Sequence, residues 1–125
     1  MTAPAWATIH FVRLGKAERA EMARFPLGYR LEGSRLVINE DEAAVVQRIF
    51  AEFTRPYIRA GLSEIANGLN VDGIPTQRGG RWYASTVRYI LGNQVYAEAP
   101  SAIITRGAYD QAQSRLASMR RGPRR

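Results

Sequence analysis

With 125 residues, the chain is long enough for one compact domain with a modest hydrophobic core. It has no cysteine, which excludes disulfides and thiolate metal sites, and no apolar run near the roughly 20 residues that cross a bilayer. The formal net charge is +7, and residues 74–125 carry the whole surplus, with nine arginines against two acidic residues. This asymmetry is typical of proteins that bind a polyanion such as nucleic acid.

The N-terminal part of the chain predicts a helix and then a hairpin. Residues 16–24 are good helix formers, and Pro26 should end that helix. Residues 27–38 alternate in polarity around Gly33-Ser34, which has the form of a two-residue turn. We therefore expect residues 1–25 to be an N-terminal extension and the main domain to span residues 26–119.

A longer helix should follow the hairpin. Asn39 is a good N-cap, and Glu42, three residues later, completes the pattern of a capping box. Apolar residues then recur at helical spacing, and Arg55-Pro56 ends the pattern; the buried face is formed by Val46, Ile49, Phe50 and Phe53.

Two short amphipathic helices are expected over 62–71 and 84–91, with Gly73 placed to end the first of them. Residues 95–105 should be extended, Ala108–Met119 helical, and 120–125 a disordered basic tail. The predicted fold class is mainly α with a small β-hairpin (α+β), with a helix-turn-helix-like arrangement and an enlarged basic loop.

The loop and helix after Gly73 are the best candidates for a binding site. Val87, Ile90 and Leu91 form an apolar stripe, which leaves a polar face of Ser85, Thr86, Arg88 and Tyr89. A helix fits the major groove of B-DNA, where such side chains read base edges. The preceding loop carries Arg78 and Arg81 beside two glycines, which let the backbone approach a phosphate. Trp82 should be buried, with its indole N–H bonded to a backbone carbonyl. Many domains of three amphipathic helices nevertheless bind no DNA.

The chain offers no good case for an enzyme. Its one histidine, His10, has no identifiable partner, and neither Ser63 nor Ser85 has a base near it in sequence. The acids at 40–42 fit the first turn of a helix, where the dipole favours negative charge. We expect no catalytic residue, metal or cofactor, and no membrane association.

Several segments, in this order and spacing, resemble the recombinase domain of large serine recombinases. They cover roughly 90 residues: Pro26–Arg30, Glu42–Phe50, Glu64–Ala66, Leu69–Asn70, Gly73–Thr76, Gly79–Leu91 and Asn93–Tyr96, with a weaker likeness from Pro100 to Leu116 to the family's closing strand and helix. At the position before the third helix, where the family usually has a capping Ser or Thr, this chain has Tyr83. Ser85 is therefore expected to cap that helix instead.

The resemblance implies a role in site-specific recombination and DNA integration. In that family the domain binds half of an attachment-site core, between a catalytic domain with a serine nucleophile and a zinc-ribbon domain. We see no counterpart of those two domains and expect no catalysis by this chain alone. The residues expected to contact double-stranded DNA are Thr76, Arg78, Arg81, Ser85, Thr86, Arg88, Tyr89, Arg120 and Arg121.

Other hypotheses stay open at this point. The chain could be an accessory protein-interaction domain that pairs with a full-length serine recombinase through residues 1–25. Non-specific RNA binding is weaker, because no strand pattern presents exposed aromatics. The absence of cysteine and of a signal peptide in residues 1–10 favours the cytoplasm of a bacterial or phage-type system, in association with the nucleoid.

Overall fold

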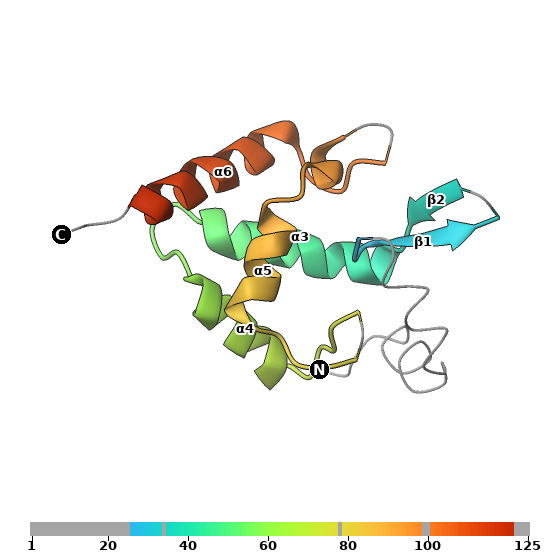
Figure 1. Ribbon diagram of the computed structural model, residues 1–125, viewed down its shortest axis with the longest axis horizontal. Coiled ribbons are helices and arrows are strands. Elements are labelled where there is room, and N and C mark those ends of the chain that lie inside the picture. Colours follow the sequence, from blue (N-terminus) through green and yellow to red (C-terminus); the bar gives the residue numbers. More distant parts are fainter. Residues whose placement is uncertain (1–25, 34, 78, 99–100, 122–125) are drawn as a thin grey trace.

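The computed structural model describes residues 26–33, 35–77, 79–98 and 101–121. In these residues a two-stranded antiparallel hairpin precedes four α-helices and a short 3-10 helix (Figure 1). The elements are β1 (Tyr29–Glu32), β2 (Arg35–Ile38), α3 (Glu40–Thr54), α4 (Leu62–Val71), α5 (Ala84–Leu91), η1 (Gln94–Ala97) and α6 (Arg106–Arg121). The predicted α+β class is confirmed, whereas the helix expected over 16–24 lies outside the described residues.

The hairpin is fixed to the rest of the fold through Gly28. Tyr29 pairs with Ile38, and the backbone N–H of Asn39 donates to the Gly28 carbonyl at 2.8 Å. Gly28 has a φ of +104°, and a Cβ there would lie 2.8 Å from Cδ1 of Ile103. Only glycine meets both conditions without strain, because the left-handed region and the close contact both exclude a side chain.

Helix α3 begins as predicted at Asn39, but the capping box is only half formed. The Asn39 side chain accepts from the Glu42 N–H at 3.2 Å. The Glu42 carboxylate, expected to return to the Asn39 N–H, instead accepts from the Gly28 N–H at 2.9 Å. The prediction was wrong there because the Asn39 N–H is already bonded to Gly28. Glu42 thus ties α3 to the hairpin.

Burial makes Glu42 an unusual carboxyl group. The residue is 0 % exposed, and its Oε2 has no hydrogen-bond partner in the described part of the chain. Desolvation raises its pKa to about 7, with a smaller raising contribution from Asp41, against the Gly28 N–H, which stabilises the charged form. The fold therefore holds a carboxyl group that is costly to ionise.

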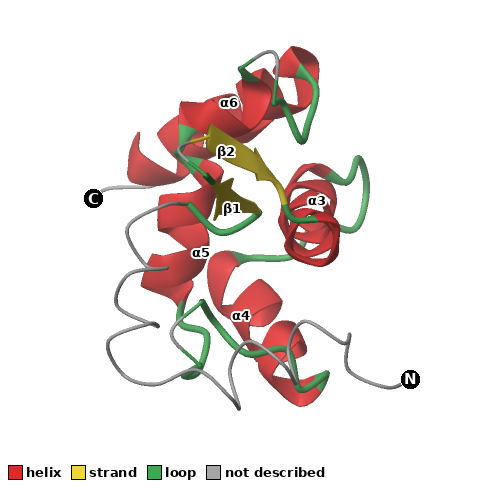
Figure 2. Cartoon of the chain, turned by 90° about the vertical axis from the view of Figure 1, so that its right-hand side faces the viewer, coloured by secondary structure: helices red, strands yellow, loops and turns green. Residues whose placement is uncertain are grey.

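Helix α3 contacts each of the other three helices. Figure 2 shows it nearly end-on, with α4, α5 and α6 gathered along one side of it. Arg48 links it to the end of α4, since its guanidinium bonds Glu52 at 2.8 Å and Asp72 at 2.7 Å. The largest fully buried apolar side chains come from almost every element: Tyr29, Val46, Ile49, Phe50, Phe53, Ile65, Leu69, Trp82, Val87, Leu91 and Tyr96.

The segment expected to be extended after α5 is instead a 3-10 turn followed by bends. The Asn93 side chain accepts from the Val95 N–H at 3.2 Å and starts η1. This turn directs Tyr96 into the core, where its hydroxyl donates to the Leu27 carbonyl at 2.7 Å and its ring stacks on Tyr29. In an extended strand, successive side chains would point to opposite faces. The chain here instead forms a helical turn, so the prediction of an extended segment was wrong.

Helix α6 is longer than predicted at both ends. Thr105 starts it, because its hydroxyl oxygen accepts from the Ala108 N–H at 3.1 Å. It continues to Arg121, so the prediction of a disordered tail was wrong for Arg120 and Arg121. Positively charged residues are favourable at the C-terminus of a helix because of the helix dipole. Residues 122–125 lie outside the described residues.

Candidate nucleic-acid interface

Helices α4 and α5 pack against each other and are joined by a loop with a defined start. Gly73 has a φ of +75°, its N–H donates to the Asn70 carbonyl, and the Ile74 N–H donates to the Leu69 carbonyl, both at 3.0 Å. These two bonds form a Schellman motif, which satisfies carbonyls at the end of α4. The prediction that Gly73 ends this helix is confirmed.

Trp82 and Asn70 fix the start of α5 against α4. Trp82 is 2 % exposed, and its indole N–H donates to the Ile74 carbonyl at 2.8 Å, as predicted. The Asn70 side chain accepts from the Trp82 N–H at 2.8 Å and donates to the Trp82 carbonyl at 3.0 Å. This amide clamp holds the backbone just before the helix, so the exposed face of α5 has a set orientation.

The basic loop before Trp82 is closed by Thr76. Its hydroxyl oxygen accepts from the Gly80 N–H at 2.9 Å, and its carbonyl accepts from the Gly79 N–H at 2.8 Å. Gly79 has a φ of +87°, which this turn requires. Thr76, expected to contact DNA, therefore also shapes the loop. Arg78 lies outside the described residues.

Helix α5 has the two faces that the sequence predicts. Val87, Ile90 and Leu91 are buried, whereas Ser85 and Tyr89 are exposed. Thr86 and Arg88 are half-buried between these faces. The polar face is thus a continuous surface that starts next to Arg81, which is exposed.

The first turn of α5 lacks the side-chain cap that was expected. Tyr83, in extended conformation and without a capping hydrogen bond, is the N-cap, so the prediction that Ser85 caps the helix was wrong. The reason is that Asn70 fixes Trp82, and the helix starts directly after Tyr83. The Tyr83 carbonyl accepts from Thr86 and Val87. Among the described residues nothing accepts from the N–H groups of Ala84 and Ser85, so two donors at the start of α5 are free.

The cations beside α5 are not neutralised by carboxylates. In the described ranges, ion pairs join Arg30 to Glu32, Arg48 to Glu52 and Asp72, and Arg106 to Asp110. Arg81 and Arg88 take part in none of them. Unpaired guanidinium groups on an exposed face are suited to phosphate and to guanine edges.

The remaining candidate residues are placed apart from this surface. Arg120 and Arg121 belong to the C-terminal end of α6, away from the loop that precedes α5 in both views (Figures 1 and 2). The structure therefore brings together Arg81, Ser85, Thr86, Arg88 and Tyr89, with Thr76 in the adjoining loop, but not the two α6 arginines.

No local pattern predicts the contacts that hold the other end of α5. The Gln113 side chain donates to the Leu91 carbonyl at 2.6 Å, and the Tyr109 hydroxyl donates to the Gly92 carbonyl at 3.3 Å. Both come from α6 and occupy carbonyls that a helix end otherwise leaves without partners. Helix α5 is thus fixed at both ends, which sets the orientation of its exposed side chains.

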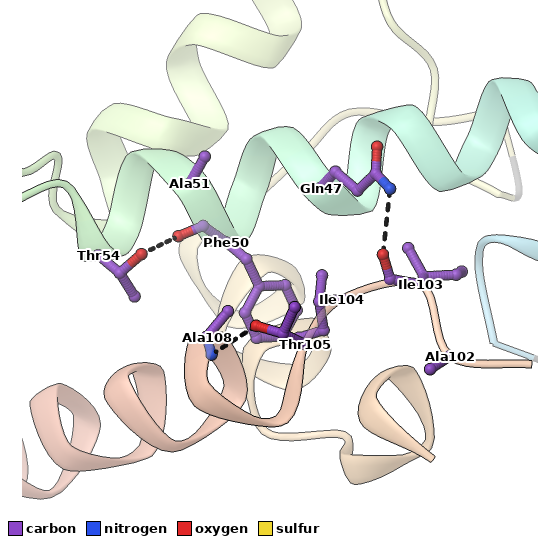
Figure 3. Close-up of a pocket in the computed structure, with 9 residues that line it drawn as sticks. All are labelled: Gln47, Phe50, Ala51, Thr54, Ala102, Ile103, Ile104, Thr105 and Ala108. Atoms are coloured by element: carbon purple, nitrogen blue, oxygen red, sulfur yellow. Dashed lines mark hydrogen bonds between the residues drawn. The ribbon is translucent and has the colours of Figure 1, made fainter. Parts of the chain in front are cut away.

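A hollow on another part of the surface carries none of the candidate residues. It lies between α3 and the chain that enters α6, has a volume of about 430 Å³, and is lined mainly by apolar groups (Figure 3). Its polar groups bond to each other: Gln47 to the Ile103 carbonyl, Thr54 to the Phe50 carbonyl, and the Ala108 N–H to Thr105. The Gln47 bond joins α3 to the segment that leads into α6, and the other two lie within α3 and at the start of α6, so all three serve the fold.

Two classes of site are not found in the part of the chain that the structure describes. It contains no group of three or more His, Asp or Glu side chains placed to hold a metal ion. None of its helices combines the length and the apolar character needed to cross a membrane.

Comparison with known proteins gives two positive findings. The sequence profile of the family described as Recombinase matches residues 40–119. A solved structure described as a crystal structure of an LSR–DNA complex, where LSR stands for large serine recombinase, has a similar fold, with a TM-score of 0.64 and 18% sequence identity. The similarity covers 78% of this chain and 33% of the other, so this chain corresponds to about a third of that protein's length. No curated protein sequence matches the chain.

Proposed function

The chain belongs to the Recombinase family, and on that premise we propose that it binds double-stranded DNA with helix α5 in the major groove. One observation carries the proposal: the polar face of α5 presents a half-buried Arg88 and an exposed Tyr89, with an unpaired Arg81 just before the helix, and this helix is fixed at both ends. The protein of similar fold was crystallised in a complex with DNA, which adds support.

We assign different tasks to the groups on this surface. Ser85, Thr86, Arg88 and Tyr89 face the base edges, where hydroxyl and guanidinium groups discriminate between base pairs. Arg81, the free N–H groups at the start of α5 and, in the loop, Thr76 and Arg78 contact phosphates. Arg120 and Arg121 add a separate electrostatic contact from the end of α6.

We further propose that this binding serves site-specific recombination and DNA integration by a serine recombinase. By this proposal the chain recognises a DNA half-site and acts together with a serine recombinase, which cleaves and rejoins the strands. The corresponding compartment is the cytoplasm of a bacterial or phage-type system, at the nucleoid. The alternative that residues 1–25 dock a partner protein concerns residues outside the described part of the chain.

Replacing Arg88 by alanine tests the assignment of α5. We expect roughly tenfold or greater weakening of duplex binding, since one arginine contact to a base or phosphate contributes about 1–3 kcal/mol. The measurement is a fluorescence-anisotropy titration of a labelled duplex, with circular dichroism to verify the fold.

Arg30→Ala is the matched control for this experiment. It removes the same charge from the exposed hairpin, where Arg30 is paired with Glu32 at 3.2 Å. It should leave affinity nearly unchanged. Equal affinities of wild type and Arg88→Ala would contradict the placement of α5 in the groove.

A further inference from the structure

The loop between α3 and α4 exposes an apolar tip between two arginines. Tyr57 is 94 % exposed and Ile58 is 77 % exposed, and both Arg55 and Arg59 beside them are exposed. Two adjacent large apolar side chains in solvent are a candidate contact surface when charged groups surround them. No acidic residue lies between Thr54 and Gly61.

Both ends of this loop are fixed by hydrogen bonds to the helices. One guanidinium nitrogen of Arg115 donates to the Phe53 carbonyl at 2.7 Å and to the Ala60 carbonyl at 2.9 Å. The same guanidinium lies over the Phe53 ring, 4.3 Å from its centroid, and the Ala60 N–H donates to the Glu52 carbonyl. The exposed tip is therefore held in a set position rather than loosely tethered.

A polar hollow of about 460 Å³ lies between this loop and α6. Its lining consists of guanidinium, hydroxyl and amide groups together with one proline, and includes no carboxylate: Thr54, Pro56, Arg59, Gln111, Ser114, Arg115 and Ser118. Neither Arg59 nor Arg115 forms an ion pair within the described ranges. A bound anion would pair with both guanidinium groups, offset part of their charge and accept hydrogen bonds from the hydroxyl groups.

The charges around Arg115 also favour a bound anion in this hollow. Its pKa is lowered from the ordinary arginine value, first by burial and then by the positive charge of Arg59, with Glu64 acting in the opposite direction. Arg59 and Arg115, which line the same hollow, therefore repel each other, and Glu64 offsets only part of this repulsion. An anion in the hollow would relieve this repulsion.

We propose that the hollow and the loop tip form a second contact with the DNA backbone. Arg59 and Arg115 bind one phosphodiester group, and Tyr57 and Ile58 lie against the deoxyribose next to it. The backbone of DNA alternates anionic phosphates with apolar sugar faces, which matches this pairing of cations and apolar side chains. The inference rests on the proposed function, since it extends the DNA surface beyond α5.

The position of the loop fits such a contact. It directly precedes α4, the helix that packs against α5, and lies beside the C-terminal half of α6, at the side of the domain opposite the hairpin (Figure 1). A helix of 10 residues is about 15 Å long. This length is close to the roughly 12 Å width of the major groove. Asn70, near the end of α4, holds the start of α5, so the loop at the start of α4 lies about one groove width from the base of α5.

Arg59→Ala tests the second contact, because Arg59 is exposed and donates no hydrogen bond within the described residues. Duplex binding is measured by anisotropy at a series of salt concentrations. We expect about tenfold weaker binding at low salt, and a slope of log affinity against log salt that is smaller by about one unit, as for the loss of one phosphate contact. Tyr57→Ser with Ile58→Ser should weaken binding while leaving the slope unchanged, since no charge is removed.

Arg106→Ala is the matched control, because Arg106, in α6, is an exposed arginine like Arg59 but is paired with Asp110. It should keep the wild-type slope. If the wild type binds the duplex and Arg59→Ala has the same affinity and the same salt slope, the second contact is overturned. The proposed function would then stand. If the wild type binds no duplex at all, both fail. If inorganic phosphate protects the fold of the wild type and Arg59→Ala equally, no anion is held by Arg59, which also overturns the inference.

Discussion

Replacing Trp82 by alanine is expected to lower the free energy of unfolding by about 3–5 kcal/mol, as for other large-to-small changes at fully buried aromatic positions. The indole is 2 % exposed and packs where α4, the basic loop and α5 meet. Its loss leaves a cavity and removes the hydrogen bond to the Ile74 carbonyl. Because domains of this size are stable by only about 5–15 kcal/mol, the variant should be close to unfolding.

Urea denaturation followed by circular dichroism measures this effect. Trp82→Phe is the matched variant, because it keeps most of the buried ring and loses only the indole N–H. It should lose clearly less stability than Trp82→Ala. An unchanged denaturation midpoint in Trp82→Ala would show that the indole is not a core residue and that α5 is held in another way.

The second large effect is a loss of stability as pH rises, caused by Glu42. Its pKa is near the ordinary value of 4.5 when the chain is unfolded and about 7 in the folded protein. Between these values the folded state binds more protons than the unfolded state, so stability falls as pH rises. The stability that protonation of Glu42 contributes is fully present below about pH 4.5 and lost above about pH 7. At 1.36 kcal/mol per pKa unit, this contribution amounts to about 3 kcal/mol.

Glu42→Gln isolates this contribution, because glutamine is neutral at every pH and still offers an oxygen to the Gly28 N–H. Unfolding free energies of both proteins are measured between pH 5 and pH 8. The variant should gain stability relative to the wild type as pH increases, and the difference should level off above about pH 7. Parallel pH curves for the two proteins would show that Glu42 titrates normally.

Local patterns predicted most helices correctly. The stripe from Val46 to Phe53 and the stripe on residues 84–91 place the buried faces of α3 and α5 where the structure has them. The N-cap at Asn39 and the glycine stop at Gly73 were also correct, since each depends on residues within one helical turn. Helical periodicity is a local property, so it survives without knowledge of the tertiary fold.

Contacts between distant segments were beyond these patterns. Glu42 bonds to Gly28 rather than to its own N-cap because the hairpin returns to α3, which no local pattern encodes. Tyr96 turns into the core through η1 because Leu27, far away in the sequence, offers a carbonyl. The extended segment predicted there failed for this reason.

In the candidate site, too, local patterns were predicted and contacts between distant segments were not. The polar face of α5 follows from its apolar stripe, and the structure keeps Arg81, Ser85 and Tyr89 exposed as expected. The clamp between Asn70 and Trp82 was not foreseen, because an asparagine at a helix end has many ordinary roles. The sequence also does not predict that Arg59 and Arg115 interact, since this depends on how α6 packs beside the loop.

The most direct test of the central claim is the salt dependence of wild-type binding to a random-sequence duplex and to a single strand, measured by fluorescence anisotropy. The release of counterions makes log affinity fall by about 0.9 per phosphate contact for each unit of log salt. We predict tighter binding to the duplex and a slope of about −3 or steeper. Absence of duplex binding even at low salt would contradict the claim and assign the positive charge of residues 74–125 to another partner.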